Sequence, residues 1–210
     1  MKPRETIVPD VEFEAVYRVA PPMTQLVMLL AREAGLRHAA ILQFSASCCN
    51  FENRTIMGRT KGGASYNVPM TQRLYERLLF ACAGTRDSKV SLLAQYNRRA
   101  SRNPAYNTIS SGLFKAKQAA GVTSAWGLHD LRRTAARALY ERTRDIRKVQ
   151  RFLSHSSPMQ TWWYIGNVGI ELTHEEIEVV SCHPRPEPEE PPNNELEANA
   201  PTPSAEKRIA

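Results

Sequence analysis

The sequence lacks a long hydrophobic run. Its longest apolar stretch, residues 26–31, is far shorter than the roughly 20 residues that a membrane-spanning helix needs. No apolar segment of the kind found in secretory signals follows Met1. The cysteines lack CxxC or His-paired metal spacing, so we expect reduced, small buried side chains at Cys48, Cys49, Cys82 and Cys182. These absences favour a soluble cytoplasmic protein with no membrane partner.

Acidic residues are scarce outside the C-terminal tail. Residues 183–210 hold six Glu, three bases and seven prolines, and almost nothing apolar, so we expect this tail to be disordered. Residues 1–182 carry 25 Lys and Arg against 15 acids, enough chain for one domain with a core. Such a balance favours a polyanionic partner, because Lys and Arg gain from phosphate neutralisation and counterion release. A solvated basic helix face is the ordinary alternative.

Periodicity and turn signals predict a mainly helical domain with one small sheet. Asp10 is expected to cap the first helix, and Gly35 to end the second. Strands over 55–57 and 65–68 would form an antiparallel hairpin with Lys61 near its tip. The other predicted helices cover 23–34, 36–42, 71–83, 108–120, 128–142, 145–153, 158–165 and 173–180.

Several residue types present here would serve a metal-free phosphodiester exchange. That reaction needs a nucleophile that forms a covalent ester, fixed cations on the non-bridging oxygens, and a proton donor for the leaving 5′ oxygen. Arginine suits the second task, because its planar fork binds phosphate bidentately and stays protonated.

The basic candidates lie at three places in the chain. His129 and Arg132, three residues apart, share one face near the start of a predicted helix, where the helix dipole favours anions. Arg37 follows the Gly35 helix stop, and Lys61 precedes two glycines. Taken singly, each has an ordinary explanation as a solvated side chain, and an HxxR pattern is common in helices.

The remaining candidates are His155 and Tyr164. His155 lies just before a predicted helix, and Tyr164 follows it by nine residues, near that helix's end. A tyrosine beside Trp162 and Trp163 is more often a core residue than a nucleophile. The two tryptophans are expected to pack in the core rather than to stack on nucleic-acid bases.

The order of these motifs resembles the catalytic domain of the tyrosine recombinase, or phage integrase, family. The resemblance covers about residues 8–181 and lies in Gly-Leu-Arg at 35–37, Lys61 before a strand, His-Asp-Leu-Arg-Arg-Thr at 129–134, Leu-Ser-His-Ser-Ser at 153–157 and Thr-Trp-Trp-Tyr at 161–164. It implies an α+β, mainly helical fold with a small antiparallel sheet. Residues 1–182 would form the catalytic domain, with no N-terminal core-binding domain evident before it.

The resemblance also implies a role for each site residue. Arg37 and Arg132 would clamp the scissile phosphate, Lys61 would protonate the departing 5′ oxygen, and His129 would assist proton transfer. His155 would bond the phosphate, and Tyr164 would be the nucleophile of a 3′-phosphotyrosine link.

The implied partner is double-stranded DNA, and no metal or other cofactor is implied. The resemblance also implies a homo-tetramer on paired recombination sites, located in the cytoplasm at the nucleoid. The DNA contacts would come from Arg37, Lys61, Arg132 and Arg133. A cluster of Arg and His beside a phosphate is expected to favour the tyrosinate form of the nucleophile. The helix predicted over 173–180 resembles the segment that family members pack against a neighbouring protomer.

The sequence departs from the family pattern at three positions. Ala40 stands where an acidic residue is frequent, Arg133 where His is common, and Ser154 where Gly is usual. The chain also begins at the catalytic domain, so it is either a short, complete member resembling the invertases or a fragment of a longer integrase.

Two alternatives to an integrase or invertase stay open. One is a DNA-binding regulator or accessory protein without recombination activity. The other is an enzyme that nicks and relaxes DNA, as the related type IB topoisomerases do. A complete set of six reactive groups argues against the pure binder, which has no need of them.

Overall fold

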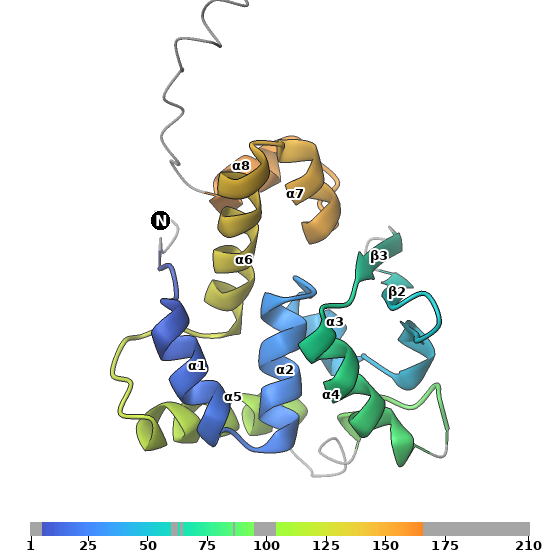
Figure 1. Cartoon of the computed structure of the whole chain (residues 1–210), viewed down its shortest axis with the longest axis vertical. Helices are drawn as coiled ribbons and strands as arrows, with labels where there is room; N and C mark the ends of the chain where they lie inside the picture. The colour runs from blue at the N-terminus through green and yellow to red at the C-terminus, as the bar shows by residue number, and fades with distance from the viewer. Residues whose placement is uncertain (1–5, 60–62, 64, 86, 95–103, 166–210) are drawn as a thin grey trace, which may run out of the picture. The chain divides into compact units, whose positions relative to one another are not determined.

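A helix that is apolar on all sides lies at the centre of the fold. In the computed structural model, which describes residues 6–59, 63, 65–85, 87–94 and 104–165, helix α2 (Pro22–Arg32) buries residues 26–31 completely. Such a helix is stable only when other elements cover every face. Helix α2 packs against α3 (His38–Leu42), α4 (Gln72–Ala83), α5 (Pro104–Ala119) and α6 (Leu128–Thr143) (Figure 1).

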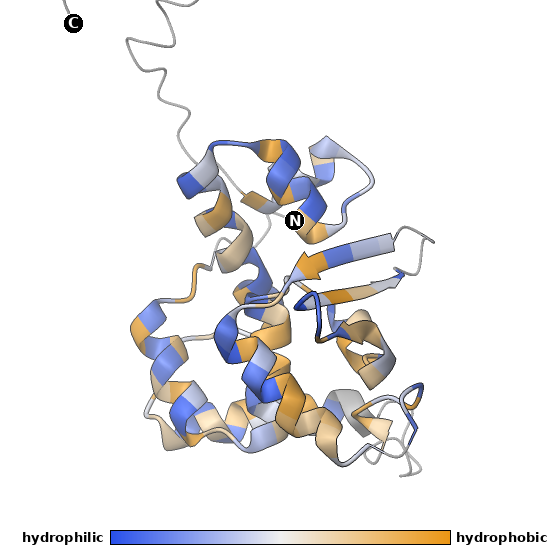
Figure 2. Cartoon of the chain, turned by 45° about the vertical axis from the view of Figure 1, so that its right-hand side comes forward, coloured by the Kyte–Doolittle hydropathy of each residue, from blue (hydrophilic) through white to orange (hydrophobic). Residues whose placement is uncertain are grey.

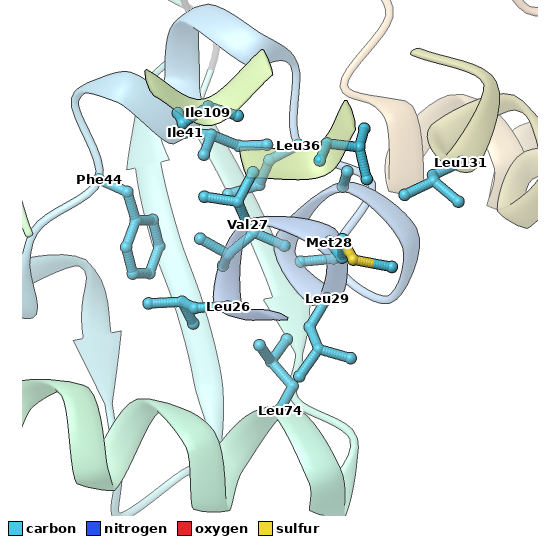
Figure 3. Packing of buried hydrophobic residues seen from close by; sticks show 14 of the residues in the cluster. Leu26, Val27, Met28, Leu29, Leu36, Ile41, Phe44, Leu74, Ile109 and Leu131 are labelled. Atoms are coloured by element: carbon cyan, nitrogen blue, oxygen red, sulfur yellow. The ribbon is translucent and has the colours of Figure 1, made fainter. Parts of the chain in front are cut away.

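The core forms around α2 from residues that are distant in sequence. Figure 3 shows Val27, Met28 and Leu29 among side chains from several surrounding elements, which include Leu36, Ile41, Phe44, Leu74, Ile109 and Leu131. Burying each large aliphatic side chain contributes about 1.5–3 kcal/mol. The helices around α2 carry both hydrophilic and hydrophobic residues along their length (Figure 2), as expected for elements with one buried face.

Helix α1 (Asp10–Val19) confirms the expected helix but not its cap. The N-cap position is Pro9, and Asp10 lies in the first turn without a side-chain capping bond. Its carboxylate instead accepts a hydrogen bond from Arg32 of α2. The prediction that Asp10 caps the helix is therefore wrong, because the ion pair between helices engages its side chain.

The small sheet confirms the predicted hairpin. Within the described residues, β1 (Cys49–Asn50), β2 (Thr55–Arg59) and β3 (Ser65–Pro69) form an antiparallel sheet in that order, after a 3₁₀ turn at Ala46–Cys48. Ile56 pairs with Val68 and Gly58 with Tyr66. Ile56, Tyr66 and Val68 are buried, which fixes the register, because a one-residue slip would expose all three. Lys61 of the hairpin tip lies outside the described residues.

A second, smaller hydrophobic cluster joins the end of α6 to α7 (Ile146–Leu153) and α8 (Pro158–Ile165). Its buried residues are Ala136, Tyr140, Val149, Leu153 and Ile165. Trp162 packs edge-on against Tyr140, with ring centroids 5.7 Å apart, and so acts as the packing anchor that the sequence predicts. Phe152 contacts both this cluster and the core around α2.

The described residues belong to one compact unit, Met1–Gly169. The helix predicted over 173–180, the tail 183–210 and Cys182 lie outside them, so the division at residue 182 stays a prediction. Cys48, Cys49 and Cys82 are free and half-buried. None of the described helices combines the length and apolar character that crossing a bilayer requires.

The turn at Gly35 connects α2 to the rest of the site. Gly35 has φ +60°, a left-handed conformation, and it lies against the ring of Phe152. A Cβ atom at this position would approach Phe152 Cε1 to 2.6 Å. The residue thus serves two purposes: it reverses the chain after α2, and it allows α7 to pack closely against that turn.

We predict that Gly35→Ala lowers the free energy of unfolding by about 2–4 kcal/mol, from left-handed strain and overpacking against Phe152. Urea denaturation measures the change. The control is Gly84→Ala, where φ is −95° and no atom lies within 4 Å of the added Cβ, so a change within about 0.5 kcal/mol is expected. Equal effects at the two glycines would contradict this account of the turn.

Candidate active site

The start of α6 positions three of the predicted site residues on one face. The Gly127 N–H donates to Oδ2 of Asp130 at 2.9 Å, which fixes the first turn of the helix. His129, Arg132 and Arg133 then follow at helical positions i, i+3 and i+4, so their side chains are neighbours.

The segment before α6 is held in turn by α1. Trp126 is buried, and its Nε1–H donates to Oε2 of Glu12 at 2.8 Å. The hydroxyl of Ser124 donates to the same carboxylate. Lys117 of α5 donates to the carbonyl oxygens of Ser124 and Trp126. The residues that position α6 therefore come from two other helices.

Arg132 is the most enclosed charge of the site, with an exposed fraction of 3%. Its guanidinium donates to the carbonyl oxygens of Gly35 and of Leu153, the latter at 2.7 Å. Its Nη2 also lies 3.3 Å from Nε2 of His155. The Nε–H has no hydrogen-bond partner among the described residues. Burial lowers the pKa of Arg132 to about 10, which still leaves it cationic at neutral pH.

His155 is held in one tautomer. Its backbone N–H donates to the Gln150 carbonyl, and the Gln150 side chain donates back to the His155 carbonyl, both at 3.0 Å. Because arginine can only donate, Nε2 must accept from Arg132, and Nδ1–H then donates to Oγ1 of Thr161 at 3.1 Å. Burial lowers the pKa of His155 to about 4, and the charges of Arg132 and Arg37 act in the same direction. The ring is therefore neutral at pH 7.

Tyr164 of α8 lies between the two histidines. Its hydroxyl is 3.1 Å from Nδ1 of His129, and its ring packs edge-on against the rings of His129 and His155, at centroid distances of 5.0 and 5.2 Å. The guanidinium carbons of Arg132 and Arg133 each lie 5.5 Å from the centre of the ring. The hydroxyl thus lies within hydrogen-bond distance of an imidazole nitrogen, at a site lined with cations.

The protonation of this pair reflects a competition between burial and charge. Burial raises the pKa of Tyr164, and the charges of Arg132, Arg133 and Arg37 only partly oppose it. The sequence leads us to expect a tyrosinate beside a bound phosphate; the protein alone instead favours the phenol. For His129, burial and the charge of Arg133 lower the pKa, which favours the neutral imidazole.

The structure brings together most of the predicted site residues. Arg132, His155, His129 and Tyr164 form one contact network. Arg37 is exposed, immediately before α3, and its charge lowers the pKa of each of these four groups. Lys61 lies outside the described residues, so its role stays a prediction.

Sequence reasoning did not identify the groups that hold these side chains. They are the carbonyl oxygens of Gly35 and Leu153, the side chain of Gln150 and the hydroxyl of Thr161. Backbone acceptors carry no residue signature, whereas Thr161 belongs to the Thr-Trp-Trp-Tyr motif and lies one helical turn before Tyr164. That spacing is the signal that could have indicated it.

The departure at Ser154 has a visible consequence. Ser154 follows α7 with φ +48° and ψ +48°, the left-handed conformation that commonly ends a helix at glycine. Its own N–H bonds the carbonyl of Arg151, which closes the helix. The backbone at this position explains why glycine suits it, and serine adopts it at the expense of strain.

We predict that Ser154→Gly raises the free energy of unfolding by about 0.5–1 kcal/mol, because relief of left-handed strain exceeds the entropy that glycine gains in the unfolded chain. Thermal unfolding followed by circular dichroism measures the change. Ser156→Gly is the control, since Ser156 is exposed and has no positive φ, and no stabilisation is expected there. Destabilisation by Ser154→Gly would contradict the argument.

The fold is that of a tyrosine recombinase catalytic domain. The family model described as "Phage integrase family" matches residues 12–168, and the chain belongs to that family. Over 40 residues the chain is 52% identical to the probable integrase/recombinase YoeC of Bacillus subtilis (strain 168). That match covers 19% of this chain and 22% of the Bacillus protein.

Solved structures show the same fold. XerA recombinase matches with a TM-score of 0.62 at 19% identity, over 86% of this chain and 64% of that one. The Tn1549 transposon integrase in complex with circular intermediate DNA matches with a TM-score of 0.59 at 17% identity, over 84% of this chain and 67% of that one. A lambda integrase dimer bound to a COC′ core site matches with a TM-score of 0.58 at 22% identity, over 81% of this chain and 62% of that one. The chain thus spans about two thirds of these proteins' length.

Proposed function

We propose that this chain is a site-specific recombinase that cuts and rejoins DNA strands through a 3′-phosphotyrosine intermediate on Tyr164. The observation that carries the proposal is the position of the Tyr164 hydroxyl, 3.1 Å from Nδ1 of His129 and beside the buried guanidinium of Arg132. This geometry supports the proposal, because a nucleophile, its proton acceptor and a fixed cation would have to lie this close together.

The proposed first step transfers one strand end to the protein. The Tyr164 oxygen attacks the scissile phosphorus as its proton passes to Nδ1 of His129, and the bond from phosphorus to the 5′ oxygen breaks. Lys61 supplies the proton that the departing oxygen needs. Attack by a 5′ hydroxyl of a partner strand reverses the step, so the bond energy is conserved in the ester.

Two arginines would stabilise the charge that develops on the non-bridging oxygens. Arg132 has an Nε–H donor that no group among the described residues accepts from, and Arg37 is exposed close by. Fixed donors aimed at developing charge contribute about 3–4 kcal/mol each in comparable sites. Arg133 is proposed as a further DNA contact, beside Arg37, Lys61 and Arg132.

The proposed partner is double-stranded DNA. Residues 98–151 contain thirteen Lys and Arg and three acids, and α6 and α7 lie within this segment. The Tn1549 integrase was solved in complex with circular intermediate DNA, and the lambda integrase dimer was solved bound to a COC′ core site. We extend the proposal to a homo-tetramer on paired sites, acting at the nucleoid, with the predicted helix over 173–180 contacting a neighbouring protomer.

We predict that Tyr164→Phe abolishes the covalent adduct while DNA binding survives, because only the attacking oxygen is removed. Duplexes selected by binding to the chain would be nicked beside candidate scissile positions, so that the cleaved end diffuses away and the adduct accumulates. Denaturing gels with and without protease, followed by mass spectrometry of the phosphopeptide, detect it. Tyr75→Phe on α4 is the matched control and should retain the adduct.

The outcomes separate the candidate functions. An adduct that persists in Tyr164→Phe would contradict the assignment of the nucleophile. Binding without an adduct by the unaltered chain would favour the DNA-binding regulator. An adduct that relaxes supercoiled DNA but never exchanges strands between two duplexes would favour the topoisomerase-like alternative.

A further inference from the structure

Arg133 is a buried cation for which the described residues supply no ion pair. Its exposed fraction is 8%, and its Nε–H makes no hydrogen bond to any described residue. Among those residues, no carboxylate lies within ion-pair distance of it. Arg132, its neighbour in sequence, instead donates to two backbone carbonyls. A charge without an ion pair is costly away from water, and among the described residues the group that the Arg133 guanidinium contacts is the Tyr164 ring.

The guanidinium of Arg133 faces the proposed nucleophile and its proton acceptor. Its central carbon lies 5.5 Å from the Tyr164 ring centre, and it follows His129 by one helical turn. The other charged or titratable groups that act on this pair are Asp130 and Arg132 of α6, Arg37 before α3 and His155 after α7. Asp130 already accepts a hydrogen bond from the Gly127 N–H.

We propose that Arg133 is a positioning residue that keeps His129 unprotonated and Tyr164 ready to donate its proton. This proposal rests on the function proposed above for Tyr164 and deepens it. A fixed positive charge beside the pair repels a proton from the imidazole and attracts the negative charge that develops on the phenol oxygen. The Nδ1 lone pair then remains available to the hydroxyl 3.1 Å away.

The charges around the pair support this role. After burial, Arg133 is the largest influence that lowers the pKa of His129, ahead of Arg132 and Arg37. It also lowers the pKa of Tyr164 against the effect of burial. Arg132 is engaged with the carbonyls of Gly35 and Leu153, so Arg133 carries the charge that is not committed to holding the fold.

Histidine titration by NMR on the free protein tests this role without relying on any reaction. Arg133→Met keeps most of the side-chain length and removes the charge, and the His129 signal is assigned with His129→Asn. We expect the pKa of His129 to rise by about 0.5–1 in Arg133→Met. In Arg133→Lys it should stay near that of the unaltered chain.

Arg137→Met is the matched control. Arg137 lies on the same helix but pairs with Glu141, so its removal should leave the His129 titration unchanged. An unchanged His129 pKa in Arg133→Met would overturn the proposal, as would equal shifts in the Lys and Met variants. If Arg133→Met does not fold, Arg133→Gln replaces it. Unfolding of both neutral variants would assign Arg133 a structural role and overturn the proposal as well.

The pH profile of adduct formation is the second readout. The acid limb should move to higher pH in Arg133→Met and return in Arg133→Lys, because a neutral His129 is required. If the unaltered chain forms no adduct at any pH, the function proposed for Tyr164 fails, whereas the NMR titration still decides whether Arg133 controls His129. The two failures are therefore distinguishable.

Discussion

The guanidinium of Arg132 is the group on which the arrangement of the site depends. Buried, it needs acceptors, and it finds them in carbonyls near the ends of two helices, at Gly35 after α2 and Leu153 at the end of α7. The Leu153 carbonyl lacks a partner within α7 and lies at the negative end of that helix's dipole, whereas Gly35 lies in the turn beyond the end of α2. The guanidinium thus supplies hydrogen-bond donors, and the two carbonyls supply the acceptors that it needs. The same bonds bring Arg37, two residues after Gly35, and His155, two after Leu153, to one place.

The turns at these two carbonyls are made by residues in the left-handed conformation. Gly35 and Ser154 both have positive φ, and both are followed closely by a proposed site residue. The chain therefore reverses at the points where it meets Arg132. Phe152 packs against the Gly35 turn and joins the two hydrophobic clusters, so the packing of α7 and the geometry of the site are coupled.

Among the described residues, the site gathers more positive charge than negative, with three arginines against Asp130. Arg37, Arg132 and Arg133 all act on the Tyr164 phenol, yet burial still keeps its pKa above the ordinary value. A phosphate in this place would meet donors already fixed in position, which is the arrangement that stabilises charge as it develops. His155 would have to turn its Nε2 from acceptor to donor in order to bond a phosphate oxygen.

Most of the secondary structure could be predicted from local patterns. The Thr71 hydroxyl caps α4 and the Asp145 carboxylate caps α7, as such residues commonly do at helix starts. The β2–β3 hairpin forms where the predicted strands lie. Asp10 failed as a cap because an ion pair with Arg32, distant in sequence, engages its carboxylate. The motifs identified side chains that meet at the candidate site, but not the backbone carbonyls that hold Arg132, since their positions depend on how α2, α6 and α7 pack together.

The most direct test of this account is the substitution Arg132→Lys, measured for both unfolding free energy and adduct formation. Lysine keeps the charge but cannot reach two carbonyls and His155 together, because it lacks the planar fork. We expect a loss of about 2–4 kcal/mol in unfolding free energy and a fall of at least about 100-fold in the rate of adduct formation. A lysine variant that matches the unaltered chain in both measurements would contradict the account.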